Sequence, residues 1–181
     1  YYPMVLTHAP FVATPHSEVI NETTKFKSKV DPYFGDMVSY TDHLVGRLID
    51  HVDKLGIADN TLILFTGDNG TGRGIPTQLG TRIVIGNKAY PPDAGTHVPM
   101  FARWSGPVPG GLVNDDLIDF SDFFATFADL AGVELPANDH FDGRSFRAQL
   151  AGGAGNPRDW IFIHYDKDPS HETVPFPRVR F

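Results

Sequence analysis

The sequence predicts an α/β fold in which a mainly parallel sheet is flanked by helices. Three patterns follow one another along the chain: a short apolar run over 4–7, an amphipathic helical pattern from Met37 to Leu55, and a continuous apolar run over 61–65. Strand, helix and strand in that order favour a parallel sheet covered by helices. With 181 residues, 41% of them hydrophobic, the chain has room for one domain with a sizeable core.

The first half of the chain contains the strongest helical pattern. Asp31 and Pro32 are suited to the N-cap and the first helical position, and Gly56 closes the segment. The apolar positions recur at spacings of three and four residues: Met37, Tyr40, Leu44, Leu48, Val52 and Leu55. A turn at Asp59-Asn60 then leads into a predicted buried strand over 61–65.

The second half is richer in loops. Residues 70–95 contain many Gly, Pro and Thr residues, which predicts a long ordered loop with a small hairpin strand at 81–85. Further strands are expected at 98–104 and 160–165. Ser121 is suited to cap a helix that Gly132 ends, and a shorter helix is expected to reach Leu150. The first of these helices carries an apolar face that is more typical of a core than of a ligand site: Phe123, Phe124, Phe127 and Leu130.

Composition excludes several classes of function. The net charge of -7, without a cluster of Lys or Arg, argues against nucleic acid and anionic membranes as partners. The chain has no cysteine, which excludes disulfides, thiolate metal sites and a cysteine nucleophile. It opens with Tyr1 rather than Met, in what reads as a strand already in progress, so we expect the chain to begin inside a larger protein.

The most informative stretch is Thr66-Gly67-Asp68-Asn69-Gly70, directly behind an apolar run. A carboxylate and a carboxamide at the carboxyl end of a strand supply oxygen donors where α/β sheets usually bind ligands, which indicates a metal site. The same residues are also ordinary turn formers. These five residues alone leave both interpretations open.

Two single side chains elsewhere also allow both a structural and a functional interpretation. His8 follows the first predicted strand and is either a hydrogen-bonded structural residue or a group that points into a site at the sheet edge. Lys88 lies in a glycine-rich loop and is either a solvated lysine or the group that neutralises an oxyanion. For His97 we favour a hydrogen bond across the loop. No Gly-x-Ser-x-Gly elbow and no phosphate-binding P-loop motif is present.

In their order along the chain, these segments resemble the sulfatase family of the alkaline-phosphatase-like superfamily. The resemblance is carried by the helix and strand that lead to Asp68-Asn69, by the His-x-Pro segment at His8, by Lys88, and by two further segments, 94–99 and 142–145. It implies an alkaline-phosphatase-like fold and calcium-dependent hydrolysis of sulfate esters, with a formylglycine made from Cys or Ser as the nucleophile.

The resemblance also implies roles for four residues. Asp68 and Asn69 match the metal-binding pair, His8 matches a histidine that binds the sulfate or protonates the leaving oxygen, and Lys88 matches a lysine that grips the sulfate. The implied substrates are sulfated small molecules or sulfated glycans. Export to the periplasm or the outside is common in the family, although this sequence by itself predicts no compartment.

The sequence departs from the family pattern at the nucleophile. It contains no Cys/Ser-x-Pro-x-Arg motif. We therefore expect residues 1–155 to be the C-terminal portion of a catalytic domain, 156–181 to start a small strand-rich subdomain, and the missing N-terminal part of the same protein to complete the site. Alone, the chain is expected to be inactive. Two alternatives stay open: a phosphatase or phosphodiesterase of the same superfamily, and a non-catalytic binding relative.

Overall fold

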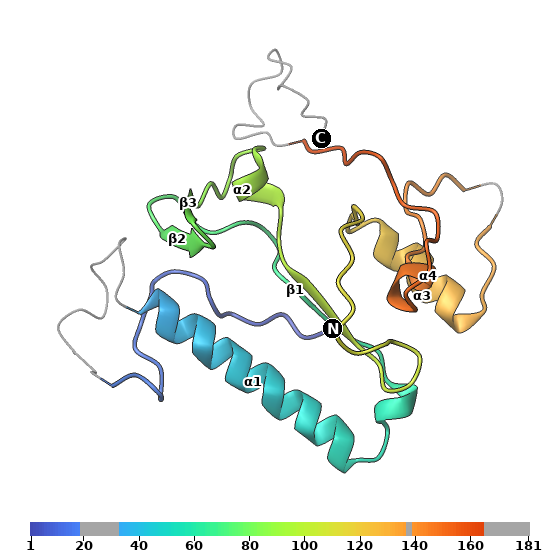
Figure 1. Ribbon diagram of the computed structural model, residues 1–181, viewed down its shortest axis with the longest axis horizontal. Coiled ribbons are helices and arrows are strands. Elements are labelled where there is room, and N and C mark those ends of the chain that lie inside the picture. Colours follow the sequence, from blue (N-terminus) through green and yellow to red (C-terminus); the bar gives the residue numbers. More distant parts are fainter. Residues whose placement is uncertain (19–32, 137–138, 165–181) are drawn as a thin grey trace.

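A central pair of strands organises the molecule. The computed structural model describes residues 1–18, 33–136 and 139–164. Strands β1 (Ile63–Thr66) and β4 (Met100–Arg103) form a ladder through the middle, and helix α1 (Phe34–Lys54) lies along one side of it (Figure 1).

The remaining elements lie around this ladder. Helices α3 and α4 lie on the side of the ladder opposite to α1 (Figure 1). The β2–β3 hairpin and α2 lie beyond the end of the ladder where β1 ends and β4 begins (Figure 1). Their bounds are β2 (Pro76–Leu79), β3 (Arg82–Ile85), α2 (Asp93–Thr96), α3 (Asp122–Ala131) and α4 (Arg147–Leu150); a single 3-10 turn, η2 (Ala58–Asn60), connects α1 to β1.

Helix α1 confirms the amphipathic pattern but not its predicted start. Met37 donates its backbone N–H to the carbonyl of Tyr33 at 2.9 Å, so the helical hydrogen bonds of the described residues begin at Tyr33. The predicted N-cap, Asp31, lies outside the described residues. At the other end Gly56 adopts a φ of 68°, a left-handed conformation that glycine tolerates without strain. Among the described residues, no helix combines the length and the apolar character that a bilayer span requires.

The strand pairing of the described residues does not confirm the prediction of a mainly parallel sheet. Both ladders in the described part of the chain are antiparallel, with Ile63 opposite Arg103 and Thr66 opposite Met100 in the central one. The predicted parallel neighbour at 4–7 forms a turn, in which the N–H of His8 donates to the carbonyl of Val5 at 3.0 Å. Strand β1 is also half-buried along its length and not fully buried.

The small hairpin within the long loop is confirmed. Strands β2 and β3 pair with Leu79 opposite Arg82, so that Gly80 and Thr81 form a two-residue turn. Gly80 has a φ of 58°, and a glycine at the first loop position is typical of the type II′ turns that join antiparallel strands.

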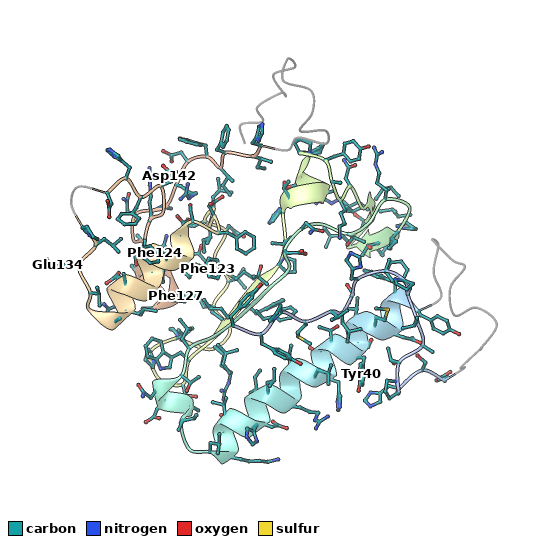
Figure 2. All side chains as sticks on the ribbon, turned by 180° about the vertical axis from the view of Figure 1, so that it is seen from behind. Tyr40, Phe123, Phe124, Phe127, Glu134 and Asp142 are labelled. Atoms are coloured by element: carbon teal, nitrogen blue, oxygen red, sulfur yellow. The ribbon has the colours of Figure 1, made fainter. Side chains whose placement is uncertain are left out.

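Helix α3 ends as predicted but is covered less than predicted. Gly132 at its C-cap has a φ of 66°. Phe123, Phe124 and Phe127 extend from the helix (Figure 2), and Phe124 and Phe127 remain 57% and 49% exposed. The prediction that this face belongs to the core is wrong for these two side chains, because the helix instead buries Asp122, Ala125 and Thr126 against the segment that leads into α4.

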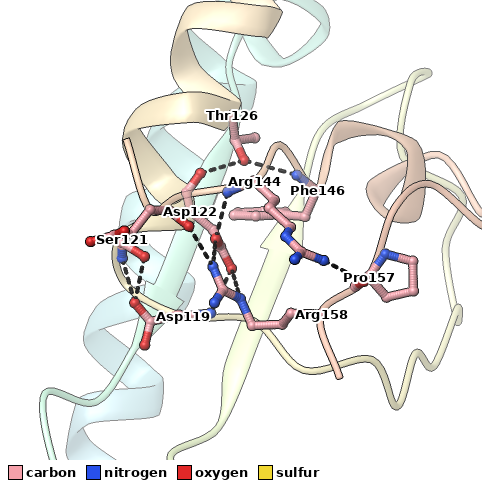
Figure 3. A network of polar contacts seen from close by, with 9 residues as sticks. Asp119, Ser121, Asp122, Thr126, Arg144, Phe146, Pro157 and Arg158 are labelled. Carbon is pink, nitrogen blue, oxygen red and sulfur yellow. Dashed lines mark hydrogen bonds and ion pairs between the residues drawn. The ribbon is translucent and has the colours of Figure 1, made fainter. Parts of the chain in front are cut away.

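A buried ion pair explains that choice of face. Asp122 binds Arg158 through both carboxylate oxygens, and it also accepts the backbone N–H groups of Asp119 and Arg144, each at 2.7 Å (Figure 3). The side chains of Asp122 and Arg158 are only 3% and 9% exposed. The carboxylate hydrogen bond raises the pKa of Arg158 above its usual value.

Two further predictions are met only in part near this network. Ser121 is the N-cap residue of α3, as predicted, but its side chain does not cap the helix; it donates its hydroxyl to Asp119 at 2.7 Å instead. Within 160–164, the described part of the last predicted strand, Ile163 is assigned a single β-bridge and no continuous strand forms; a second isolated bridge pairs Leu117 with Arg158 just before it. Most of the predicted subdomain at 156–181 lies outside the described residues.

The described core is small. Its buried hydrophobic residues are Tyr33, Met37, Ile75, Ala125, Phe146 and Leu150. Many large apolar side chains, among them Phe101 on β4, are more than half exposed. The expectation of a sizeable core is therefore wrong for the described residues, because the strands of the central ladder are largely half-buried and many large apolar side chains stay exposed.

Candidate functional site

Asp68 and Asn69 lie where the sequence places them, just after β1. Asp68 is exposed and Asn69 is half-buried. Gly67 packs beside the side chain of Val98, which leads into β4. In the described part of the chain neither side chain of the pair has a hydrogen bond or an ion pair, so their oxygens are available to a ligand.

Three glycines hold the loop behind this pair. We call Gly70, Gly86 and Gly95 the glycine junction, because at each of them an added Cβ would overlap backbone atoms of a neighbouring segment. Gly70 donates its N–H to the carbonyl of Gly95 at 2.9 Å. Only residues without a side chain allow backbones to approach so closely. The junction therefore fixes the loop after β1 against the segments on either side of Tyr90.

The same junction brings the Lys88 segment to the Asp68-Asn69 loop. The backbone N–H of Lys88 donates to the carbonyl of Thr71 at 3.0 Å, and Asn87 donates to Ala94 at 3.2 Å. Lys88 is half-buried, and its ammonium group has no hydrogen-bonding partner among the described residues. A carboxylate and an ammonium group on one loop cluster, both without a side-chain partner among the described residues, form a suitable environment for an oxyanion.

Arg73 is a residue of this cluster that the sequence analysis missed. Its Nε donates to the side-chain oxygen of Asn87 at 3.2 Å, and its guanidinium carbon lies 3.8 Å from the centre of the Tyr90 ring. A signal was available in the sequence: residues 70–92 contain Arg73, Arg82 and Lys88 but no Asp or Glu, in a chain with a net charge of -7.

His8 is held by a different part of the molecule. Its Nδ1 lies 2.6 Å from the carbonyl oxygen of Ala9. The segment around it packs on α1, where Phe11 meets Phe34 edge to face and the N–H of Val12 points at the sulfur of Met37. No hydrogen bond or ion pair in the described residues connects His8 with Asp68 or Lys88, so the role of His8 stays a prediction.

His97 makes a structural contact, but a local one. Its Nδ1 lies 3.0 Å from a carboxylate oxygen of Asp93, one helical turn earlier, and both side chains are exposed. The contact joins the first residue of α2 to its C-cap, so the hydrogen bond across the loop that we expected does not form among the described residues.

The donor set fits calcium in kind but is incomplete. Calcium prefers about six to eight oxygen ligands, of which the side chains of Asp68 and Asn69 could supply only a minority. Among the described residues, no group of three or more His, Cys, Asp or Glu side chains gathers in a way that could hold a metal ion. A cleft of about 520 Å³ opens between the first turn of α1 and residues 74–78, and its lining includes none of the four predicted site residues.

Comparison with known proteins settles the family. The Sulfatase family model matches residues 1–133, which include the Asp68-Asn69 loop, the glycine junction and Lys88. The chain belongs to the sulfatase family. The resemblance inferred from the ordered motifs is thereby confirmed.

Relatives and solved structures agree with this assignment. Rat (Rattus norvegicus) steryl-sulfatase is 34% identical over 138 residues, which are 73% of this sulfatase chain and 24% of the relative. The crystal structure of the PsFucS1 sulfatase from Pseudoalteromonas sp. superimposes with a TM-score of 0.58 at 32% identity, covering 74% of this chain and 27% of that one. The solved complex of BT4656 with its substrate D-glucosamine-2-N,6-O-disulfate gives a TM-score of 0.58 at 25% identity, covering 81% and 28%.

Two consequences follow for the sulfatase chain. The structural neighbours support the α/β fold class. The chain spans about a quarter of the length of the curated relatives it matches. The comparisons therefore assign this chain to the family without assigning it the activity of a whole sulfatase.

Proposed function

We propose that this chain supplies part of the active site of an enzyme that hydrolyses sulfate esters with the help of calcium. The observation that carries the proposal is the glycine junction, which joins the Asp68-Asn69 loop to the Lys88 segment inside the region that the Sulfatase family model matches. Oxygen donors and an ammonium group on one rigid loop cluster are suited to a tetrahedral oxyanion.

Each residue has a defined part in this proposal. Asp68 and Asn69 would hold calcium through their side-chain oxygens, and the ion would supply positive charge to the sulfate oxygens. Lys88 directs its ammonium group at the same sulfate, which stabilises the negative charge that develops during hydrolysis. His8 binds the sulfate or protonates the leaving oxygen, since an imidazole can donate a proton near neutral pH.

The rest of the site lies in polypeptide outside this chain. We propose that it contributes a formylglycine nucleophile and the remaining calcium ligands, because Asp68, Asn69, Lys88 and His8 supply no nucleophile and too few ligands for calcium. The chain alone is then inactive. The substrate class is a sulfated small molecule or a sulfated glycan, in keeping with the steryl-sulfatase name of one relative and the disulfated sugar bound by one structural neighbour.

The experiment compares two tetrahedral esters with the same leaving group. Full-length protein is assayed with 4-nitrophenyl sulfate and 4-nitrophenyl phosphate, as isolated, after chelation, and after calcium is restored. We expect faster turnover of the sulfate, its loss on chelation and its return with calcium. Faster turnover of the phosphate favours the phosphatase alternative, and turnover of neither ester favours a non-catalytic relative.

A matched pair of variants tests the metal assignment. Asp68→Ala removes a proposed ligand, whereas Asp59→Ala removes an exposed carboxylate of η2 that has no side-chain hydrogen bond among the described residues. We expect Asp68→Ala to need at least about tenfold more calcium for half-maximal activity, since each ligand carries part of the affinity. An unchanged calcium requirement would remove Asp68 from the metal site.

A further inference from the structure

The loop that carries Lys88 is a cationic lobe on an acidic chain. Residues 70–92 carry Arg73, Arg82 and Lys88 and no acidic side chain, although the whole chain has a net charge of -7. A local concentration of positive charge of this kind attracts anions to the surface where it lies. In the proposed function Lys88 is the cation of this lobe that contacts the sulfate, which leaves Arg73 and Arg82 without an assigned part.

Arg73 is the cation of this lobe that is held in place next to Lys88. It binds Asn87, the residue before Lys88, and stacks on the ring of Tyr90, two residues after it. The backbone hydrogen bond from Lys88 to Thr71 joins the same two segments at a second point. Arg73 and Lys88 therefore belong to two segments that are fastened together at several points.

The partners of Arg73 leave its charge uncompensated. Arg103, Arg147 and Arg158 each bind a carboxylate, on Asp53, Asp129 and Asp122 respectively. Arg73, in contrast, is held by a neutral amide and a neutral ring, and its Nη groups make no hydrogen bond within the described residues. A positioned guanidinium with free terminal N–H groups matches the geometry of a carboxylate or a sulfate.

We propose that Arg73 forms a second anion subsite beside Lys88, which selects sulfate esters that carry a further anionic group. The further group is a second sulfate or a carboxylate, because both present two oxygens in one plane to the guanidinium fork. This inference rests on the proposed function, in which Lys88 grips the sulfate that is removed. Asn87 and Tyr90 are positioning residues for Arg73.

The test measures binding of two probes that differ by one anionic group. Propane-1-sulfonate and propane-1,3-disulfonate are titrated calorimetrically into full-length protein; their C–S bonds are not ester bonds, so they are not substrates for ester hydrolysis. We expect the disulfonate to bind about tenfold more tightly, as one extra charge-assisted interaction provides. Equal binding of the two probes, or no measurable binding of the disulfonate, would overturn the proposal.

Two variants with the same loss of charge locate the effect. Arg73→Gln is expected to abolish the preference for the disulfonate and to leave binding of the monosulfonate unchanged. Arg82→Gln removes a cation from the first residue of β3 in the same lobe and is expected to keep the preference. If both variants lose the preference equally, the lobe acts only through its general positive field, and the proposal is wrong. If Arg73→Gln also weakens binding of the monosulfonate, Arg73 has only a structural role, and the proposal is wrong as well.

The failure of this inference is distinguishable from that of the proposed function. Wild-type turnover of 4-nitrophenyl sulfate together with no preference for the disulfonate sinks the Arg73 subsite alone. A preference that depends on Arg73 in a protein that turns over no sulfate ester sinks the enzymatic proposal and retains an anion-binding site.

Discussion

His8 is the residue whose role the structure leaves to experiment. If its imidazole protonates the leaving oxygen, a leaving group that is stable as an anion needs it less than an alkoxide does. His8→Ala should therefore lower kcat for an alkyl sulfate by about 100-fold and kcat for 4-nitrophenyl sulfate much less, in line with the size of general-acid effects. Steady-state kinetics of full-length protein give both values.

The matched control is His97→Ala, which removes an exposed imidazole bound to Asp93. It should leave the ratio of the two kcat values unchanged. An equal loss with both substrates in His8→Ala would assign His8 to binding of the sulfate rather than to proton transfer.

The glycine junction decides how well the loops hold the site. In Gly70→Ala the new Cβ meets the carbonyl of Ala94, which is backbone and cannot move aside cheaply. We expect destabilisation by about 1–3 kcal/mol, as for other overpacked positions, together with a loss of sulfate-ester turnover. Thermal unfolding and activity of the full-length protein measure the two effects.

Helix α1 offers the control for this substitution. Gly46 lies in the helix interior with nothing within 4 Å of an added Cβ. Gly46→Ala should therefore stabilise the protein by about 0.5–1 kcal/mol and leave activity unchanged. Gly70→Ala protein as stable and as active as wild type would refute the junction.

The Asp122–Arg158 pair is the strongest polar link between α3 and the segment that follows α4. Asp122→Ala leaves a buried guanidinium and two backbone N–H groups without their acceptor. We expect a loss of about 3–5 kcal/mol, as for other buried pairs broken on one side. Chemical denaturation of the full-length protein measures it, and a loss under 1 kcal/mol would contradict the assignment.

Asp129 provides an exposed comparison for Asp122. Hydrogen bonds from the hydroxyl of Ser145 and, to a smaller extent, from the side chain of Arg147 lower the pKa of Asp129 below its usual 3.8. Because the folded pKa is the lower one, any stability from this carboxylate is present above pH 3.8 and is lost as the pH falls through the folded value. Asp129→Ala should therefore cost less than about 1 kcal/mol at pH 7, as expected for a surface ion pair.

At the scale of the whole molecule, local patterns predicted elements better than they predicted pairing. The helical periodicity of α1, the turn at Gly80 and the stop at Gly132 are set by neighbours in sequence, and the structure confirms them. The parallel sheet is not confirmed among the described residues, because pairing depends on distant segments and the run at 4–7 turns instead of pairing with β1. The buried face of α3 failed for the same reason, since Asp122 is buried by its distant partner Arg158.

The residues of the candidate site also divide into those predictable from local sequence and those that depend on distant contacts. Asp68, Asn69 and Lys88 could be predicted as candidates because each lies in a short motif with a characteristic neighbour. The clamp of Arg73 by Asn87 and Tyr90 was missed because it joins positions 14 residues or more apart. A charge count over 70–92 points to a cationic lobe but not to the residue that is held in place.

The central claim is that the Lys88 segment and the Asp68-Asn69 loop form one sulfate-hydrolysing site. It is tested most directly by kcat/KM for 4-nitrophenyl sulfate in full-length wild type, in Lys88→Met and in Lys54→Met, which removes an exposed lysine at the end of α1. We predict a loss of about 100-fold or more in Lys88→Met, the size expected for removing one donor to a developing oxyanion, and wild-type values in Lys54→Met. Equal kcat/KM in all three proteins would contradict the account.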